Sequence, residues 1–147
     1  MSLNETPRSV RVHIALFGKR NAGKSSIINA ITGQDIAIVS DVGGTTTDPV
    51  YKSMEILPIG PCVIIDTAGL DDEGKLGHLR KKKTVEVLNK TDISLVVIDS
   101  VLGITDYDRY IINEIKDKDI PLIVVLNKID ILKKDNNYIK NVKEEFN

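Results

Sequence analysis

The segment GKRNAGKS, from Gly18 to Ser25, has the residue types and spacing that bind nucleotide phosphates. It fits the pattern G-x-x-x-x-G-K-S/T and lies between an apolar run and a helical pattern. The glycines permit a tight turn whose backbone N–H groups point at phosphate oxygens, and the N-terminus of the following helix adds favourable partial charge. We therefore expect Lys24 to reach the β- and γ-phosphates and the Ser25 hydroxyl to ligate Mg²⁺.

The segment NKID, from Asn127 to Asp130, follows another apolar run. The Asp130 carboxylate can accept hydrogen bonds from N1 and the 2-amino group of guanine, and adenine offers neither in that arrangement. The Lys128 stem can lie along the face of the base, and Asn127 can tie this segment to the phosphate-binding loop. The pattern predicts a guanine nucleotide.

The segment DTAG, from Asp66 to Gly69, ends a third apolar run. The Asp66 carboxylate would hold Mg²⁺ through water, and the Gly69 N–H would contact the γ-phosphate. Upstream, GGTTTD contains Thr46, which we expect to ligate Mg²⁺ only when GTP closes that loop. Together the segments predict an enzyme that binds GTP and hydrolyses it to GDP and phosphate.

The residues expected to act in hydrolysis are Lys24, Thr46, Gly69 and Asn21. The residues expected to contact the nucleotide are Gly18, Lys19, Arg20, Asn21, Ala22, Gly23, Lys24, Ser25, Ser26, Thr45, Thr46, Asp66, Thr67, Ala68, Gly69, Asn127, Lys128 and Asp130.

The elements that must position these residues alternate along the chain. Apolar, β-branched runs predict strands over Val10–Phe17, Val50–Leu57, Cys62–Asp66, Ile93–Asp99 and Leu122–Asn127. The last two are nearly continuous in Val, Ile and Leu, which is typical of parallel strands covered on both faces, whereas the second reads as an edge strand. Helical patterns cover Ser25–Ile31, Leu79–Asn89, Asp106–Lys116 and a last segment from Tyr138 to Phe146. This alternation predicts a three-layer α/β fold with a mostly parallel sheet and one antiparallel edge strand.

Composition indicates one soluble domain. The chain has 147 residues, of which 41% are hydrophobic and 28% charged, and its net charge is -1. This balance gives no electrostatic reason for nucleic-acid or membrane binding. No apolar run is long enough to span a bilayer, and the lone Cys62 reads as a reduced, buried thiol. We expect a cytoplasmic protein, with a flexible leader at 1–9 and the nucleotide-binding domain at 10–147.

The quoted segments resemble the TrmE–Era–EngA–Septin group of P-loop GTPases, which have a Ras-like G domain. Within this group, NAGKSSIINAITGQDIAIVSDVGGTTTDPVYKSMEILPIGP and DTAGLDDEGKLGHLR are similar to the GTPase domain of the FeFe-hydrogenase maturation GTPases (HydF). The resemblance implies a domain that regulates an H-cluster maturation scaffold. Its partners would be the protein's own dimerisation and iron–sulfur domains and radical-SAM maturation enzymes, with no iron–sulfur cluster in this segment. The family's SA-like guanine motif, last strand and last helix are not found, so we expect the domain to be incomplete at its C-terminal end.

Leu70 follows DTAG, where many small GTPases have a glutamine that orients water. Within the group, an apolar residue here and Asn21 in the phosphate-binding loop resemble the K⁺-dependent GTPases. The resemblance implies that Asn21 holds K⁺ with the carbonyls of Ser40 and Val42, where the ion would neutralise charge on the β–γ bridge. Alternatively, Asn21 caps the loop turn. We expect a slow intrinsic rate, and the sequence leaves the general base open.

The sequence is also compatible with other functions. One alternative is a tRNA-modification or ribosome-assembly GTPase, and another is a nucleotide-gated binding module with little turnover. The basic run Arg80–Lys83 is read as an exposed helix face, or else as a docking patch for an acidic partner.

Overall fold

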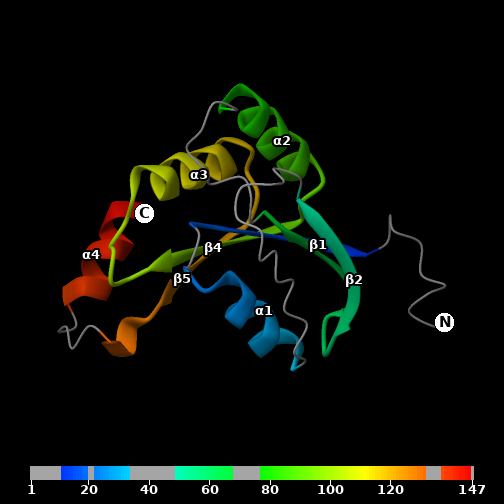
Figure 1. Cartoon of the computed structure of the whole chain (residues 1–147), viewed down its shortest axis with the longest axis horizontal. Coiled ribbons are helices and arrows are strands. Elements are labelled where there is room, and N and C mark those ends of the chain that lie inside the picture. The colour runs from blue at the N-terminus through cyan, green and yellow to red at the C-terminus, as the bar shows by residue number, and fades with distance from the viewer. Residues whose placement is uncertain (1–10, 20–21, 34–48, 68–76, 132–136, 147) are drawn as a thin grey trace.

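The sheet of the computed structural model has five strands in the order β2-β3-β1-β4-β5 (Figure 1). The structure describes residues 11–19, 22–33, 49–67, 77–131 and 137–146. β1 pairs in parallel with β3 and β4, β4 pairs in parallel with β5, and β2 is antiparallel to β3. The predicted α/β sheet with an antiparallel edge strand is confirmed. The strands are β1 (Val12–Gly18), β2 (Val50–Ile56), β3 (Gly60–Asp66), β4 (Ile93–Asp99) and β5 (Leu122–Asn127).

The helices lie on both faces of this sheet. Figure 1 shows α1 on one side and α2 and α3 on the other. Each helix lies close to its predicted range, although α2 begins at Gly77 rather than Leu79. α1 ends at Gly33, whose left-handed backbone (φ 65°) forms the C-terminal cap. The helices are α1 (Lys24–Thr32), α2 (Gly77–Asn89), α3 (Asp106–Asp117) and α4 (Asn137–Phe146), with a 3₁₀ turn at Ile129–Ile131.

Two apolar cores hold the layers together because residues of each strand alternate between the two faces of the sheet. Phe17, Ile65 and Val96 belong to the core under α2 and α3, and Phe146 of α4 packs against the same core. Leu16 and Ile64 belong to the other core, which includes Ile28 of α1 and the buried Cys62. Cys62 is therefore the buried thiol that the sequence predicts.

β5 is less covered than its sequence predicts. Val96 in β4 is fully buried, whereas Ile123 in β5 is 53% exposed. β5 is an edge strand, and on the face it shares with α4 a cavity of about 600 Å³ remains, lined in part by Val124, Val142 and Phe146. The expectation of two covered faces is wrong for this strand, since an apolar run alone does not distinguish a central strand from an edge strand.

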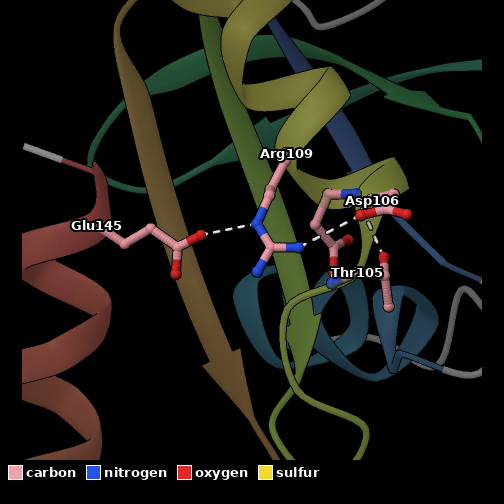
Figure 2. Close-up of polar contacts among 5 residues, drawn as sticks. Thr105, Asp106, Arg109 and Glu145 are labelled. Atoms are coloured by element: carbon pink, nitrogen blue, oxygen red, sulfur yellow. Dashed lines mark hydrogen bonds and ion pairs between the residues drawn. The ribbon is translucent and has the colours of Figure 1, made fainter.

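α3 begins at a capping box. The Thr105 hydroxyl accepts a hydrogen bond from Asp108 N at 3.3 Å, and the Asp108 carboxylate accepts one from Thr105 N at 3.0 Å. Farther along α3, Arg109 contacts Asp106 of its own helix and Glu145 of α4, at 3.4 and 2.7 Å (Figure 2). The cap fixes where α3 starts, and Arg109 joins α3 to α4.

The basic run of α2 and the His13 residue of β1 have the following surroundings. Lys81 and Lys82 in α2 are exposed, as expected of a solvated helix face, while Arg80 and Lys83 are half-buried. His13 lies in β1, and its backbone N–H donates to the Asp92 carboxylate at 2.8 Å. Within the ranges given above, no helix is long and apolar enough to cross a membrane.

Candidate nucleotide-binding site

The predicted site residues lie where parallel strands end at one edge of the sheet. Gly18 ends β1, Asp66 ends β3, Asp99 ends β4 and Asn127 ends β5. The register aligns Leu16 with Asp66, and Asp99 with Asn127. Because the carboxyl ends of parallel strands meet at the same edge, segments far apart in sequence come together here, as ligand sites of open α/β sheets do.

The phosphate-binding loop turns tightly into α1. Ala22 N donates to Lys19 O at 3.0 Å, and Gly23 takes a left-handed conformation (φ 102°) as the N-cap of α1. A Cβ atom on Gly23 would lie 2.0 Å from the Asn127 side-chain nitrogen. Only glycine therefore fits at this position, because both the backbone conformation and the close approach of Asn127 exclude a side chain.

The start of α1 is suited to an anion. Among the residues the structure describes, no side chain caps the helix, and its first turn contains no acidic residue. Lys24 is buried, and its ammonium donates to the Gly18 carbonyl across the loop. The helix N-terminus and a buried cation thus act on the same small volume, which is the arrangement that binds phosphate.

The end of β3 provides a buried carboxylate. Asp66 is 2% exposed. The next residue, Thr67, is also buried, and its hydroxyl donates to Leu16 O at 2.7 Å, so this hydroxyl fixes β3 to β1. Outside the undescribed segments, no group of three or more His, Cys, Asp or Glu residues gathers. A single carboxylate with the hydroxyl of Ser25 fits Mg²⁺ that takes its other ligands from phosphate and water, and does not fit an all-protein metal cage.

NKID joins the phosphate-binding loop by the contact that the sequence predicts. The Asn127 side-chain amide donates to Ala22 O at 2.9 Å. Lys128 follows with a positive φ of 62°, and its ammonium donates to the Asp99 carboxylate at 2.8 Å. Asp130 lies in the 3₁₀ turn Ile129–Ile131 and is exposed. The arrangement leaves the Asp130 carboxylate accessible to a base.

Asp99 is part of this edge, although its sequence context did not single it out. It is 9% exposed, and its Oδ1 accepts hydrogen bonds from Val101 N at 2.9 Å and Leu102 N at 3.4 Å. The bond from Lys128 lowers the pKa of the Asp99 carboxyl, with the two backbone N–H groups adding to the effect. One signal was available, since Asp99 ends an apolar strand as Asp66 does.

Several expected site residues lie outside the described residues. They are Arg20, Asn21, Thr45, Thr46, Ala68 and Gly69, together with Leu70 and the predicted K⁺ contacts of Ser40 and Val42. Their assignments stay predictions. The structure brings together Gly18, Lys19, Ala22, Gly23, Lys24, Ser25, Asp66, Thr67, Asn127 and Lys128 at one edge of the sheet, with Ser26 exposed on the first turn of α1 and Asp130 just beyond β5.

The geometry agrees with a comparison against known protein families. Residues 13–128 match a family described as 50S ribosome-binding GTPase. The chain belongs to this family. It is a GTP-binding, GTP-hydrolysing domain, as its three sequence segments predict.

Similar proteins include GTPase Der of Wolinella succinogenes, which is 42% identical over 147 residues, with 97% of this chain and 30% of Der covered. The tRNA modification GTPase MnmE of Desulforamulus reducens is 43% identical over 119 residues, with 80% and 25% covered. The chain thus spans about a third or less of these relatives.

Two solved structures of Era have a similar fold. Aquifex aeolicus Era bound to GDP and AlF₄⁻ is 31% identical, with a TM-score of 0.70 and with 90% of this chain and 46% of Era covered. Era in complex with MgGDPNP and a segment of 16S ribosomal RNA gives a TM-score of 0.71 at 31% identity, with 91% and 46% covered. These relatives place the chain in the TrmE–Era–EngA group.

Proposed function

We propose that the chain is the GTP-dependent switch of a ribosome-assembly GTPase. The observation that carries this proposal is the match of residues 13–128 to 50S ribosome-binding GTPases. The complex of Era with 16S ribosomal RNA supports it, because that relative binds ribosomal RNA while Mg²⁺ and a GTP analogue are bound. The chain's net charge of -1 is not that of a general nucleic-acid binder, so we expect any ribosome contact to be specific and nucleotide-dependent.

Sedimentation with purified ribosomal subunits tests this function. The chain should pellet with one subunit in a non-hydrolysable GTP analogue and remain in the supernatant in GDP. Asp130→Asn is the matched control, because its binding should follow a xanthosine triphosphate analogue instead. Equal pelleting with GDP and with the GTP analogue would contradict a switch. Selective co-purification of tRNA would favour the tRNA-modification alternative, which the similarity to MnmE supports.

Hydrogenase maturation is the second candidate. The TTTDPV run and the Gly60–Pro61 pair at the start of β3 resemble the HydF GTPase domain. In this case the chain would bind radical-SAM maturation enzymes and not ribosomal subunits. Retention of such an enzyme on the immobilised chain, with no subunit binding, would decide for this candidate.

Residue roles at the nucleotide follow from the arrangement at the edge of the sheet. The loop N–H groups and Lys24 would hold the phosphates, and the hydroxyl of Ser25 and the Asp66 carboxylate would hold Mg²⁺, the latter through water. When bound, Mg²⁺ neutralises charge on the phosphates. Ser25→Ala should weaken GDP binding far more in Mg²⁺ than in EDTA, and an equal loss in both would contradict this role.

Asp130 would select guanine. Asp130→Asn should weaken GDP binding and improve binding of xanthosine diphosphate, whose 2-oxo group prefers an amide donor. Titration calorimetry with both diphosphates measures this change of base preference. Unchanged GDP affinity in Asp130→Asn would remove the guanine assignment.

Hydrolysis would be stimulated by K⁺. Support comes from the sequence, where Asn21 stands in the phosphate-binding loop and Leu70 replaces a water-orienting glutamine. In other GTPases an arginine that stabilises the transition-state charge accelerates hydrolysis about 10³–10⁵-fold, so an ion with this role should give about tenfold or more. Single-turnover hydrolysis should be faster in K⁺ than in Na⁺, and Asn21→Ala should remove the difference. Equal rates in both ions would favour a partner-supplied group.

A further inference from the structure

We propose that Asp99 is a positioning residue for guanine selectivity, because it holds the Lys128 ammonium and fixes the segment that presents Asp130. This inference rests on the proposed guanine-reading role of Asp130. Asp99 belongs to β4, whereas the other two residues follow β5. Its action is therefore indirect, through Lys128, and it does not require contact with the nucleotide.

The two oxygens of Asp99 serve two different segments. Oδ1 accepts from the backbone N–H groups of Val101 and Leu102, at 2.9 and 3.4 Å, and so orders the turn that follows β4. Oδ2 accepts from the Lys128 ammonium at 2.8 Å. The Asp99 side chain is 10% exposed and that of Lys128 is 31% exposed, so water screens this ion pair less than a surface pair. A hydrogen bond between two charged groups is stronger than one between neutral groups, and partial burial preserves that strength.

The backbone around Lys128 is held from both sides. Ser100 N donates to Asn127 O at 3.0 Å, and the Asn127 side chain donates to Ala22 O at 2.9 Å. Lys128 itself takes the left-handed conformation (φ 62°), which a residue with a side chain adopts only when its surroundings impose it. The bond to Asp99 is one such contact, since it fixes the far end of the Lys128 side chain.

Two consequences follow for the nucleotide. With its ammonium held by Asp99, Lys128 presents its methylene stem, and not a free charge, to the base. The segment also leaves Lys128 in a fixed direction, so that Asp130, two residues later, meets N1 and the 2-amino group of guanine together. Loss of the bond should therefore reduce selectivity for guanine as well as affinity.

Asp99→Asn tests this role with little change of shape. The amide oxygen can still accept from Val101 N, which leaves the amide NH₂ facing the Lys128 ammonium. We expect GDP affinity to fall about tenfold or more, as the loss of a charged hydrogen bond predicts. The preference for GDP over inosine diphosphate, which lacks the 2-amino group, should narrow. Asp92→Asn is the matched control, because Asp92 also accepts a backbone N–H, from His13 at 2.8 Å, just before the opposite end of β4.

A double-mutant cycle separates positioning from a purely structural role. In a Lys128→Ala background, Asp99→Asn should change GDP affinity by less than about twofold, because the bond to Lys128 is already gone. If the same tenfold loss persists in that background, Asp99 acts through Val101 and Leu102 only, and the proposal is overturned. Should Asp99→Asn not fold, Lys128→Met replaces it, since it keeps the stem and removes the charge. An unchanged ratio of GDP to inosine diphosphate affinity in Lys128→Met would also overturn the proposal.

The change of base preference in Asp130→Asn, from guanine to xanthine, distinguishes failure of the Asp99 proposal from failure of the guanine assignment. If Asp130→Asn binds xanthosine diphosphate while Asp99→Asn keeps wild-type selectivity, the guanine assignment stands and the role of Asp99 fails. If Asp130→Asn does not gain affinity for xanthosine diphosphate, the guanine-reading role of Asp130, on which the inference rests, is wrong.

Discussion

Two ion pairs of nearly equal length occupy different regions of the molecule. Lys128 and Asp99 lie 2.8 Å apart at the nucleotide edge, and Arg109 and Glu145 lie 2.7 Å apart between α3 and α4 (Figure 2). The side chains of the first pair are 31% and 10% exposed, and those of the second are 47% and 38% exposed. Water screens the second pair more strongly, so distance alone does not tell which pair matters. We expect the Lys128–Asp99 pair to contribute more, because it is more buried and because Asp99 also accepts hydrogen bonds from backbone N–H groups.

The largest effect at the nucleotide edge should come from Gly23→Ala. The new Cβ would meet the Asn127 side-chain nitrogen at 2.0 Å, in a backbone conformation (φ 102°) that disfavours side chains. Displacing packed atoms costs about 1–3 kcal/mol and the left-handed conformation roughly 1–2 kcal/mol. GDP binding requires the native conformation of the loop, so we expect GDP affinity to fall about a hundredfold.

Gly33→Ala at the other end of α1 is the control for this substitution. Gly33 also has a positive φ of 65°, but a Cβ atom added there would meet no other atom within 4 Å. We expect a small loss of thermal stability and unchanged GDP binding by calorimetry. Equal binding losses for both glycine variants would show that backbone conformation, and not the contact with Asn127, limits the loop.

The next effect is on stability at acid pH, through the Asp99 carboxyl. Because the pKa of Asp99 is lowered in the folded protein, its carboxylate stays ionised at pH values where the unfolded chain takes up a proton. Its stabilising contribution is complete above the ordinary pKa of 3.8 and is lost as pH falls through the lowered folded pKa. The difference in unfolding free energy between wild type and Asp99→Asn should therefore shrink below pH 3.8, as urea titrations would measure. A difference that grows with acid would contradict the burial of this pair.

Thr105→Ala should have a smaller effect, at the start of α3. It removes the hydroxyl that accepts from Asp108 N, and loss of such a cap costs about 1 kcal/mol. Thermal unfolding measures this loss, and Thr105→Ser, which keeps the hydroxyl, should restore most of it. GDP selectivity should not change, because the cap lies outside the contacts of Lys128.

The smallest effect should follow Glu145→Gln. Arg109 retains its contact with Asp106 at 3.4 Å, and solvent replaces the lost charge. We expect no measurable change in the thermal midpoint at physiological salt. A clear loss of stability, together with a weak effect of Asp99→Asn, would reverse the comparison between the two pairs.

The sequence predicted the elements and most of the nucleotide edge because both rest on local patterns. The phosphate-binding loop, the end of β3 and NKID are each recognised by a short motif of fixed spacing. The presence of both the loop motif and NKID also predicted the contact between Asn127 and the loop. Asp99 was missed because its partner lies 29 residues away, and only the pairing of β4 with β5 brings the two together. Coverage of β5 was misjudged for a related reason, since strand order and helix placement, and not apolar content, decide exposure.

The contact between Asn127 and Ala22 spans 105 residues of sequence. During synthesis, which proceeds from the N-terminus, the phosphate-binding loop leaves the ribosome long before Asn127 does. A nascent chain would therefore carry the loop without the amide that ties it to NKID. Nucleotide that binds only the completed edge shifts the folding equilibrium toward the native state. GTP should therefore stabilise the contact between the loop and NKID only after both segments have left the ribosome.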